Sequence, residues 1–286
     1  MLGFGVEIPM NDEEFRLLRD FVYQYCGMFF KDESKYLLQK RLGRRLQHHR
    51  LRTFREYYYL LRYSPNKDQE LTELINLVTT NETYFFREEF QLKTFVADVL
   101  PEVRERKQAQ GQKRLRIWSA GCSTGEEPYT LAMLMMEDGK WDDWQVDIIG
   151  TDICQRVLQS ARQGVYSESA FRSTERYFRD RYFQKEGARY RIEDRVKKWV
   201  TISHLNLLDA PRVSLLGYLD VVFCRNVIIY FDAAAKRKVI DAFYQRLHPE
   251  GFLLLGHSES LMNLSNAFQL RHLTHDMVYQ KPARQG

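Results

Sequence analysis

The sequence is poor in the features that mark membrane, secreted and fibrous proteins. No apolar run approaches the ~18 residues of a membrane span, and the start, MLGFGVEIPMNDEEF, lacks the basic stretch and apolar core of a secretory signal. Glycine (15 residues) and proline (7 residues) are too few for a collagen-like or low-complexity chain. We therefore expect a globular, cytoplasmic protein that does not insert directly into a membrane.

Cysteine is also scarce. The four cysteines, Cys26, Cys122, Cys154 and Cys224, lie far apart, and no CxxC or cysteine–histidine spacing is present. A disulfide framework or a zinc site would need clustered spacings. We expect four reduced thiols that serve in packing, and no bound metal.

The composition that remains is that of a globular protein with about two domains. The chain has 286 residues, of which 44% are hydrophobic and 28% charged, and a typical domain takes about 150 residues. The net charge of +5 is a mild excess. It identifies no partner until the basic residues are located along the chain.

The hydrophobic pattern changes along the chain and predicts where the domains lie. Apolar residues at three- and four-residue spacing predict an all-helical domain over residues 1–90. A polar, charged stretch broken by Gly111 predicts a linker over 91–112. From 113 to 286, short apolar strands alternate with helical patterns, which predicts an α/β domain whose parallel sheet has helices on both faces. The predicted strands include LRIWSA, VDIIG, VTIS, LDVVFC and GFLLLG.

A glycine loop, Gly121 to Gly125, follows the first strand and precedes a helix that begins with Glu126 and Glu127. Strand, glycine loop and helix are typical of nucleotide sites, but GxxxG is not the GxGxxG that cradles a pyrophosphate. The two glutamates also place negative charge where a phosphate would dock. A cationic ligand without phosphate fits better, and S-adenosylmethionine is such a ligand. The alternative is a plain tight turn in an α/β domain.

Polar residues also follow the other predicted strands, at the sheet edge where ligands of α/β proteins bind. Asp152 ends the second strand, near the spacing of the acidic residue in dinucleotide sites, and can accept hydrogen bonds from ribose hydroxyls. Asn206 follows a later strand and either reads an adenine edge or is a turn residue. Arg225 and Asn226 end the fourth strand. With the glycine loop, these residues support an adenosyl ligand.

Five segments of the chain, taken in order, match the signature of a known family. They are TTNETYFFRE (79–88), WSAGCSTGEEPYTLAM (118–133), GTDI (150–153), CRNVIIYF (224–231) and GHSES (256–260). They resemble the CheR-type chemoreceptor glutamate methyltransferases. The resemblance implies an all-helical N-terminal domain and a Rossmann-like S-adenosylmethionine-dependent methyltransferase domain. It also implies a small antiparallel β-subdomain, which we place at about 189–202.

The resemblance also implies candidate site residues. Those that would line the cofactor pocket are Asn81, Thr83, Arg87, Glu126, Asp152, Asn206, Leu207, Arg225 and Asn226. Arg87 and Tyr230 are the candidates for catalysis, with Tyr230 near the transferred methyl. Without the resemblance, Asn81 would be interpreted as a helix cap and Arg87 as an ordinary surface charge.

The GHSES segment contains the residue types of a hydrolase triad, His257, Ser258 and Glu259. It lacks the GxSxG pattern of a nucleophile elbow. We therefore expect a turn after the fifth strand.

Residues 35–55 contain eight basic residues and no acidic one. On a helix, Arg41, Arg44 and Arg45 share one face beside a stripe of leucines. We interpret these cations as too concentrated to pair within the chain, which favours an acidic partner over a merely solvated face. By resemblance, the partner is the glutamate-rich cytoplasmic helices of a methyl-accepting chemoreceptor. Nucleic acid is disfavoured, because the ProCys and ProPro-aromatic motifs of nucleic acid methyltransferases are absent. We expect a monomer.

The implied reaction transfers a methyl group from S-adenosylmethionine to receptor glutamates, giving methyl esters and S-adenosylhomocysteine, for sensory adaptation in bacterial chemotaxis. A free glutamate has a pKa of ~4.3 and is ionised near neutrality, so it needs positioning rather than a protein base. Three alternatives stay open from the sequence. They are an RNA methyltransferase, a small-molecule methyltransferase, and a non-catalytic module that senses S-adenosylmethionine.

Overall fold

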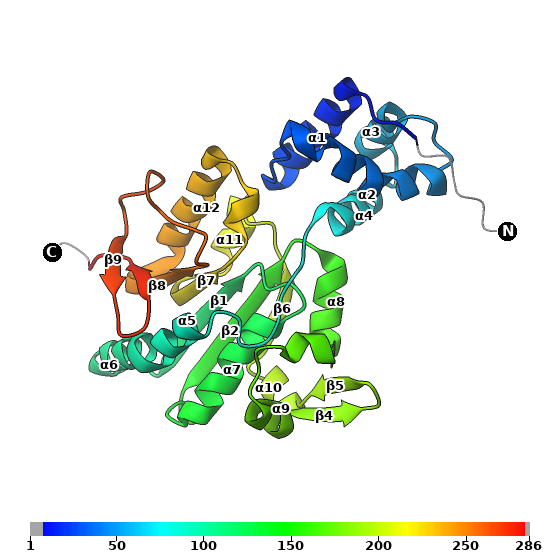
Figure 1. Cartoon of the computed structure of the whole chain (residues 1–286). Helices are drawn as coiled ribbons and strands as arrows, with labels where there is room; N and C mark the ends of the chain where they lie inside the picture. Colours follow the sequence, from blue (N-terminus) through cyan, green and yellow to red (C-terminus); the bar gives the residue numbers. More distant parts are fainter. Residues whose placement is uncertain (1–7, 284–286) are drawn as a thin grey trace. The chain divides into compact units, whose positions relative to one another are not determined.

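The computed structural model describes residues 8–283 and groups the chain into two units (Figure 1). The helical unit ends at Thr80 and also includes Tyr230–Asp232. The α/β unit contains Asn81–Ile229 and the chain from Ala233 onward. Within residues 8–283, no helix is long and apolar enough to cross a membrane.

The helical unit is built from amphipathic helices. They are α1 (Asp12–Cys26), the short η1 (Asp32–Ser34), α2 (Lys35–His48), α3 (Phe54–Tyr63) and α4 (Lys67–Val78). A capping box starts α1, because the side chains of Asn11 and Glu14 each accept the other's backbone amide. The buried stripe of α2 consists of Leu38, Leu42 and Leu46. The predicted all-helical domain is confirmed. Each of its four α-helices buries one apolar face.

Three residues from the second half of the chain, Tyr230–Asp232, belong to the helical unit. Phe231 forms an isolated antiparallel bridge with Met28. The Phe29 amide donates to the Tyr230 carbonyl over 2.9 Å, so Tyr230 has a backbone anchor in this unit.

The α/β unit contains a seven-stranded sheet in the order β6-β2-β1-β7-β8-β10-β9. The strands are β1 (Arg114–Ala120), β2 (Gln145–Asp152), β6 (Val200–His204), β7 (Leu219–Cys224), β8 (Leu247–Leu255), β9 (Gln269–His272) and β10 (Met277–Gln280). The first five strands in the spatial order run parallel, and β10 is antiparallel to both neighbours. The strands β2 and β7 lie on opposite sides of β1, so the carboxyl end of β1 is the switch point where ligands bind in such sheets.

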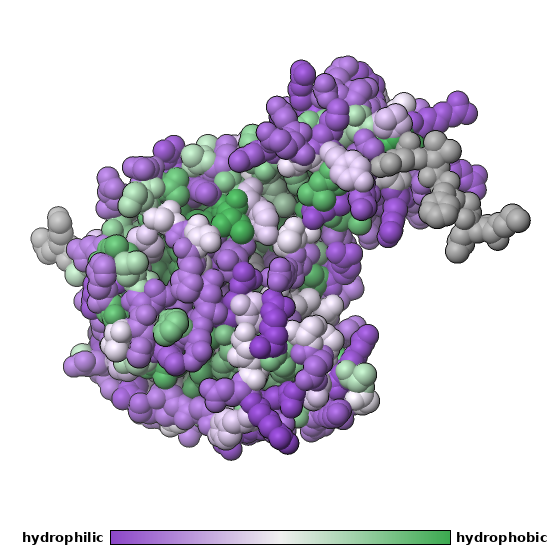
Figure 2. Space-filling view, viewed as in Figure 1, coloured by the Kyte–Doolittle hydropathy of each residue, from purple (hydrophilic) through white to green (hydrophobic). Residues whose placement is uncertain are grey.

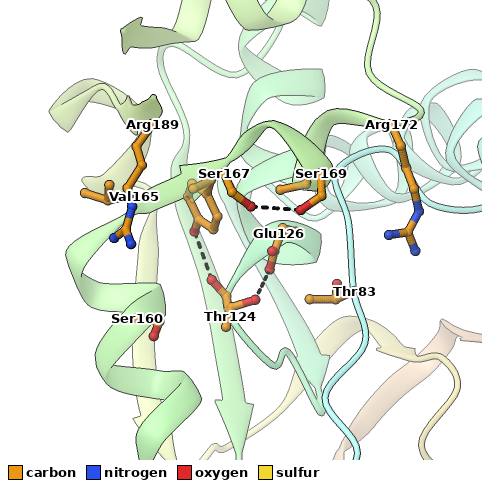
Figure 3. A pocket seen from close by; sticks show the side chains of 11 residues that line it. Thr83, Thr124, Glu126, Ser160, Val165, Ser167, Ser169, Arg172 and Arg189 are labelled. Atoms are coloured by element: carbon orange, nitrogen blue, oxygen red, sulfur yellow. Dashed lines mark hydrogen bonds between the residues drawn. The ribbon is translucent and has the colours of Figure 1, made fainter. Parts of the chain in front are cut away.

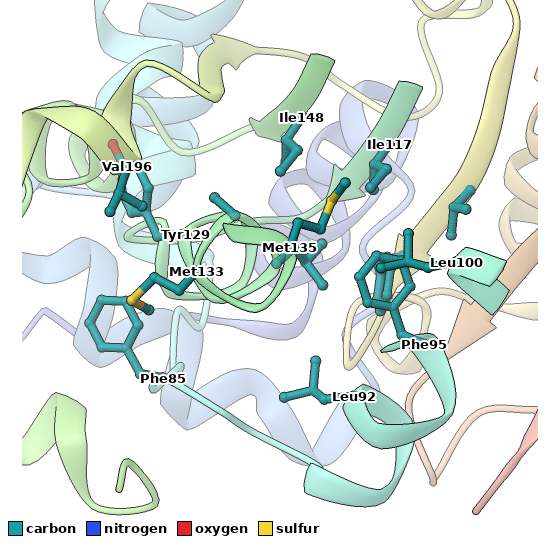
Figure 4. Close-up of a cluster of buried hydrophobic side chains, with 14 of the residues drawn as sticks. Phe85, Leu92, Phe95, Leu100, Ile117, Tyr129, Met133, Met135, Ile148 and Val196 are labelled. Atoms are coloured by element: carbon teal, nitrogen blue, oxygen red, sulfur yellow. The ribbon is translucent and has the colours of Figure 1, made fainter. Parts of the chain in front are cut away.

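Helices cover both faces of the sheet, as predicted. The main ones are α7 (Glu126–Asp138), α8 (Gln155–Gln163), α11 (Ala210–Ser214) and α12 (Ala233–Arg246), and η4 (Ile228–Tyr230) precedes α12. Ile117 of β1 lies in the buried cluster around α7, with Ile148, Met133 and Met135 (Figure 4). The next residue, Trp118, packs edge to face on Phe243 of α12. Because neighbouring residues of a strand point to opposite faces, both faces are buried.

A small antiparallel sheet, in the order β3-β5-β4, is inserted between α8 and β6. Its strands are β3 (Val165–Ser167), β4 (Phe183–Glu186) and β5 (Arg189–Ile192), with η3 (Glu168–Phe171), α9 (Arg176–Tyr182) and α10 (Asp194–Lys197) between or after them. The sheet is the expected one, but its position differs from 189–202. That range contains β5, omits β3 and β4, and reaches into β6, which pairs in parallel with β2. The alternating residues near Val200 therefore belong to the large sheet.

The segment expected as a linker, 91–112, is mostly helical and belongs to the α/β unit. It contains α5 (Glu89–Thr94), the π-helical η2 (Phe95–Val99) and α6 (Leu100–Ala109). Its apolar residues, Leu92, Phe95, Val99, Leu100 and Val103, are buried in the core of the unit. The division between the units falls instead between Thr80 and Asn81.

Candidate functional site

The loop after β1 is shaped by residues with left-handed backbone. Gly121, Ser123 and Gly125 have φ angles of 86°, 49° and 93°. A Cβ atom at Gly121 would lie 2.3 Å from a methyl of Val227, so only glycine fits there. The Gly121 and Cys122 amides both donate to the Thr151 carbonyl over 2.8 Å. These two bonds tie the loop to the carboxyl end of β2.

Asp152, predicted to hold a ribose, ends β2 and also holds this loop. Its Oδ2 accepts the Ser123 amide at 2.9 Å, and its Oδ1 accepts the Cys154 amide at 2.8 Å. Burial raises the pKa of Asp152, while the backbone donors act in the opposite direction. Each carboxylate oxygen can accept a second bond. Asp152 can therefore bind a ligand hydroxyl while it keeps the loop in place.

The Asn81–Glu88 segment, called the 81–88 segment below, lies along the same loop. The Ser123 hydroxyl donates to the Asn81 carbonyl over 3.0 Å. The Phe86 amide donates to the Thr130 hydroxyl of α7 over 3.2 Å. The structure thus brings the predicted residues Asn81 and Thr83 to the carboxyl edge of the sheet.

Phe85 anchors the 81–88 segment in the core. It is fully buried, and its ring packs against Tyr166, Phe171 and Phe183 of the small sheet and its surroundings. Its amide donates to the Ala170 carbonyl over 2.9 Å. Phe85 is therefore a core residue, as its residue type alone would suggest.

Arg87 is half-buried and turns back on its own segment. Its guanidinium donates to the Glu82 carbonyl over 3.1 Å and lies 5.5 Å from the centre of the Tyr84 ring. The Arg172 guanidinium lies 3.8 Å from the centre of the same ring and pairs with the Glu82 carboxylate at 2.8 Å. Two arginines therefore hold Tyr84 and fix the shape of the 81–88 segment.

A pocket of about 310 Å³ lies between this segment, the loop after β1 and the small sheet (Figure 3). Hydroxyl groups and two arginines dominate its lining. The lining residues are Thr83, Thr124, Glu126, Ser160, Val165, Tyr166, Ser167, Ser169, Ala170, Arg172 and Arg189. The pocket offers an acidic group from α7 and basic groups on two other sides, which suits a ligand that carries both charges.

Glu126 is the acidic group of this pocket. It is 4% exposed at the start of α7, and its carboxylate accepts the Thr124 hydroxyl at 2.6 Å. Burial raises the pKa of Glu126 to about 7. A cation bound beside it would favour the ionised form.

Arg225 follows β7 and lies in a buried ion network. It pairs with Glu88 at 3.2 Å and with Glu127 at 3.4 Å, and it donates to the Arg87 carbonyl. Glu127 also accepts the Ser119 hydroxyl at 2.6 Å, and burial raises its pKa. The geometry places Arg225 as the group that fastens the end of the 81–88 segment to the sheet edge.

Asn226 is the next residue and has a φ of 60°, unusual for a residue other than glycine. Its side-chain oxygen is buried and has no hydrogen-bond partner within residues 8–283. A buried acceptor without a donor carries a free-energy cost, which a ligand that donates to it would remove.

Asn206 and Leu207 follow β6 and are both half-buried. The Asn206 side-chain oxygen accepts the Leu208 amide over 3.0 Å, which forms a turn. The Asn206 side chain thus forms the turn that its residue type suggests, and its contact with an adenine stays a prediction. Tyr230, predicted as a catalytic residue near the transferred methyl, ends η4 and is grouped with the helical unit.

The basic residues of α2 differ in their surroundings. Arg45 pairs with the buried Glu70 at 2.8 Å, and Arg41 donates to the Val78 carbonyl at the end of α4. Burial would raise the pKa of Glu70, but hydrogen bonds from Arg45 and other groups lower it below its usual value. Arg44 is exposed and has no partner in the described part of the chain. The premise that these cations do not pair within the chain is therefore wrong for Arg45. It is also wrong for Lys35 and Arg55, which pair with Asp12 and Glu13 at 2.6 Å.

The charges at the edge of the sheet suit a cation rather than a phosphate. Glu126, Glu127 and Asp152 meet near the loop after β1, and burial raises the pKa of all three. A cation bound at this edge would favour the ionised form of these buried carboxylates. S-adenosylmethionine fits, because it brings a sulfonium and an ammonium and no phosphate, and the buried oxygen of Asn226 offers it an acceptor.

Sequence reasoning missed the residues that hold the site in shape. Ser123, Glu88, Glu127, Arg172 and Glu259 fix loops and segments through backbone or ion-pair contacts. Of these residues, only Glu259 lies in a motif from which its position could be noticed. In GHSES it lies three residues after Gly256, the glycine at the end of a strand.

Comparison with known proteins gives matches over nearly the whole chain. Residues 13–79 match the all-alpha domain of the CheR methyltransferases, and residues 81–277 match their S-adenosylmethionine-binding domain. The chain is 36% identical over 278 residues to chemotaxis protein methyltransferase 2 of Vibrio cholerae, which covers 96% of this chain and 95% of that protein. It is 34% identical to the chemotaxis protein methyltransferase of Borreliella burgdorferi, over 92% of this chain and 93% of that protein. It is also 34% identical to chemotaxis protein methyltransferase 1 of Pseudomonas aeruginosa, over 93% and 97%.

Proposed function

The chain belongs to the CheR methyltransferase family, and from this premise we propose how its residues share the work of methylating receptor glutamates. It is a chemotaxis protein methyltransferase that binds S-adenosylmethionine and acts on protein glutamates. Its substrates are chemoreceptors. The roles of single residues are the content of the proposal.

The carboxyl edge of the large sheet holds the cofactor. Asp152 accepts the ribose hydroxyls, Asn206 and Leu207 contact the adenine, and Glu126 faces the positively charged amino-acid end together with Thr83. Asn81 and Asn226 complete the edge. This assignment is supported by the positions of Asp152, Asn206 and Asn226 at or just after the ends of parallel strands and by the buried carboxylates there. Of the assigned residues, Thr83 and Glu126 line the pocket.

Bound S-adenosylmethionine supplies a methyl group that its sulfonium makes electrophilic. A receptor carboxylate oxygen forms the new bond to this methyl while the bond to sulfur breaks, and the products are a glutamyl methyl ester and S-adenosylhomocysteine. No proton is transferred, because the attacking carboxylate is already ionised. Catalysis then depends on positioning, which can lower a barrier by roughly 7 to 11 kcal/mol.

Arg87 and Tyr230 are the proposed positioning groups for the substrate carboxylate. The Arg87 guanidinium keeps unused donors, since it donates to the Glu82 carbonyl and has five N–H groups. Arg225 does not compete for this role, because Glu88 and Glu127 already neutralise it.

Receptor docking is assigned to α2, with different roles for its three arginines. Arg44 is exposed, as is the neighbouring Lys40, and both can meet a glutamate-rich helix. Arg41 and Arg45 instead hold α2 on α4. We also propose a monomer, because the large exposed apolar residues are spread over α2, α3, α9 and β9.

The observation that carries the proposal is the loop after β1, pinned by Asp152 beside the 81–88 segment. The test uses S-adenosylmethionine labelled in its methyl group and a purified cytoplasmic receptor fragment. We expect label on the receptor that mild alkali releases as methanol, and none on a matched fragment whose methylated glutamates are changed to alanine. Label that is stable to alkali, or label only on a small acid, would contradict the proposal. Cofactor binding without transfer would indicate a sensing module instead.

A further inference from the structure

The GHSES segment supplies one of the residues that hold the site in shape, the carboxylate of Glu259. Glu259 follows the turn after β8. Its Oε2 accepts the amides of Asn226 at 2.8 Å and Gly256 at 2.9 Å. Its Oε1 accepts the amides of Val227 at 2.9 Å and Ile229 at 3.2 Å. Four backbone donors from two loops thus converge on one side chain.

Only an ionised carboxylate can satisfy this arrangement. Its two oxygens together offer about four acceptor sites, whereas a glutamine side chain would present two N–H donors to the same amides. Burial raises the pKa of Glu259, and the four amides act in the opposite direction. The space is also closed, because a Cβ atom at Gly256 would lie 2.9 Å from Oε2 and 2.9 Å from the Asn226 amide nitrogen.

The residue that Glu259 constrains most is Asn226. Asn226 has a φ of 60°, and both its own amide and the next one along the chain donate to Glu259. Such a conformation persists only where the surroundings enforce it. It places the Asn226 side-chain oxygen in a buried position where it has no partner within residues 8–283.

We propose that Glu259 is a positioning residue for methyl transfer, whose carboxylate holds Asn226 in the left-handed conformation that presents its amide oxygen to the cofactor. This inference rests on the proposed function, in which Asn226 binds S-adenosylmethionine. Glu259 itself touches backbone only and acts through the loop after β7. The last amide that it holds belongs to Ile229, the residue before Tyr230.

The first test removes the carboxylate and then returns it as a free ion. Glu259→Ala deletes a group equivalent to acetate and leaves the four amides in place. We expect calorimetry to show S-adenosylhomocysteine binding weakened by about 10- to 100-fold, the usual loss when a group that orients a ligand-binding residue is removed at metal sites. Added acetate restores affinity, and sodium chloride of the same ionic strength does not. Glu105→Ala, at an exposed glutamate of α6, is the matched control and shows neither effect.

The second test asks whether Glu259 acts through Asn226. Affinities are measured for Asn226→Ala, Glu259→Ala and the double variant. If Glu259 serves to place Asn226, the double variant binds the cofactor no more weakly than the worse single variant. Fully additive losses would show that Glu259 has a general structural role and would overturn the proposal. The KM for receptor stays unchanged in the single variants, while the KM for S-adenosylmethionine rises.

Two further results would overturn the inference. One is wild-type cofactor affinity in folded Glu259→Ala, and the other is a loss that acetate does not reverse in a protein with a native circular dichroism spectrum. If Glu259→Ala does not fold, Glu259→Gln takes its place in the double-variant comparison. Failure of the proposed function would look different, because the wild-type protein would then bind cofactor without methylating the receptor.

Discussion

Among single residues, Asp152 holds the fold, and we propose that the same carboxylate also binds the ligand. It accepts the Ser123 and Cys154 amides and still has acceptor capacity toward a ribose. Asp152→Asn keeps the size of the side chain but loses the charge and one acceptor oxygen. We expect cofactor binding to weaken by roughly 1.5 to 3 kcal/mol, the range for hydrogen bonds to charged groups.

Calorimetry with S-adenosylhomocysteine measures this change. Asp143→Asn is the control, because Asp143 is also an aspartate in an ion pair, with Lys113, but lies exposed on the surface. Equal affinity in Asp152→Asn and Asp143→Asn would remove Asp152 from the ribose site.

Glu126 gives a prediction that depends on pH. Burial raises its pKa from 4.5 to about 7, so the folded protein binds a proton that the unfolded chain has already released between these values. The free energy of unfolding should therefore fall as pH rises through this window, by up to about 3 kcal/mol. In Glu126→Gln this fall should be smaller, because the buried Glu127 and Asp152, whose pKa values are also raised, still contribute to it. Denaturant unfolding at pH 5 and pH 8 checks it, and equal pH dependence in both proteins would show that Glu126 is not perturbed.

The same group links cofactor binding to protons. Near pH 7, a bound cation favours ionised Glu126, so binding should release protons. Calorimetry in buffers with different ionisation enthalpies measures the number released. Glu126→Gln should bind more weakly and release fewer protons than the wild-type protein.

At the level of elements, α2 carries two neighbouring arginines for which we propose different roles. Arg45 stabilises the fold and Arg44 docks the receptor. Arg45 faces Glu70, which is 3% exposed, and breaking a buried ion pair typically costs about 3 to 5 kcal/mol. We expect Arg45→Ala to lower the free energy of unfolding by about this amount. Arg44→Ala should change it by no more than about 0.5 kcal/mol, as for other exposed residues.

The proposed docking role of α2 is tested by methylation kinetics rather than by the free energy of unfolding. Arg44→Glu should raise the KM for receptor, most strongly at low salt, and leave cofactor affinity unchanged. Arg50→Glu, at another exposed arginine nearby, is the matched control for net charge. If Arg44→Glu methylates the receptor normally at low salt, the exposed face of α2 is only a solvated surface.

Elements with strong periodicity could be predicted from the sequence, and those whose pairing is remote could not. The helices α1 to α4 and the parallel strands follow directly from their apolar patterns. The helix α6 could not be predicted from its pattern, because it has more charged residues than buried apolar ones. The strands β9 and β10 are only four residues long, too short to stand out from loops.

The same limit applies to the candidate site. Residues at strand ends, such as Asp152, could be found because the ends of parallel strands meet at one edge. Glu259 could not be assigned, because three of its four partners are backbone amides about thirty residues earlier in the chain, as the 33-residue separation from Asn226 shows. The pairing of Arg45 with Glu70, 25 residues apart, was invisible for the same reason.

For the whole molecule, we propose that the α/β unit binds the cofactor and that the helical unit docks the receptor. We also propose that the receptor carboxylate attacks without help from a protein base. Positioning groups such as Arg87 and Tyr230 therefore lower the barrier without exchanging a proton. Tyr230→Phe should reduce the rate of methyl transfer and leave its pH dependence unchanged.

The most direct test of this claim is the pH dependence of single-turnover methyl transfer, with receptor and S-adenosylmethionine both saturating. Glu126→Gln is measured beside the wild-type protein, so that any titration of Glu126 in the profile is told apart from that of the receptor carboxylate. We predict a rate that rises with a pKa somewhat above the ~4.3 of a free glutamate, because acidic neighbours on the receptor raise the pKa of the substrate carboxylate. Above that pKa the rate should reach a plateau. A rate that still increases between pH 6 and 8 would reveal a protein base or an amine nucleophile and would contradict the account.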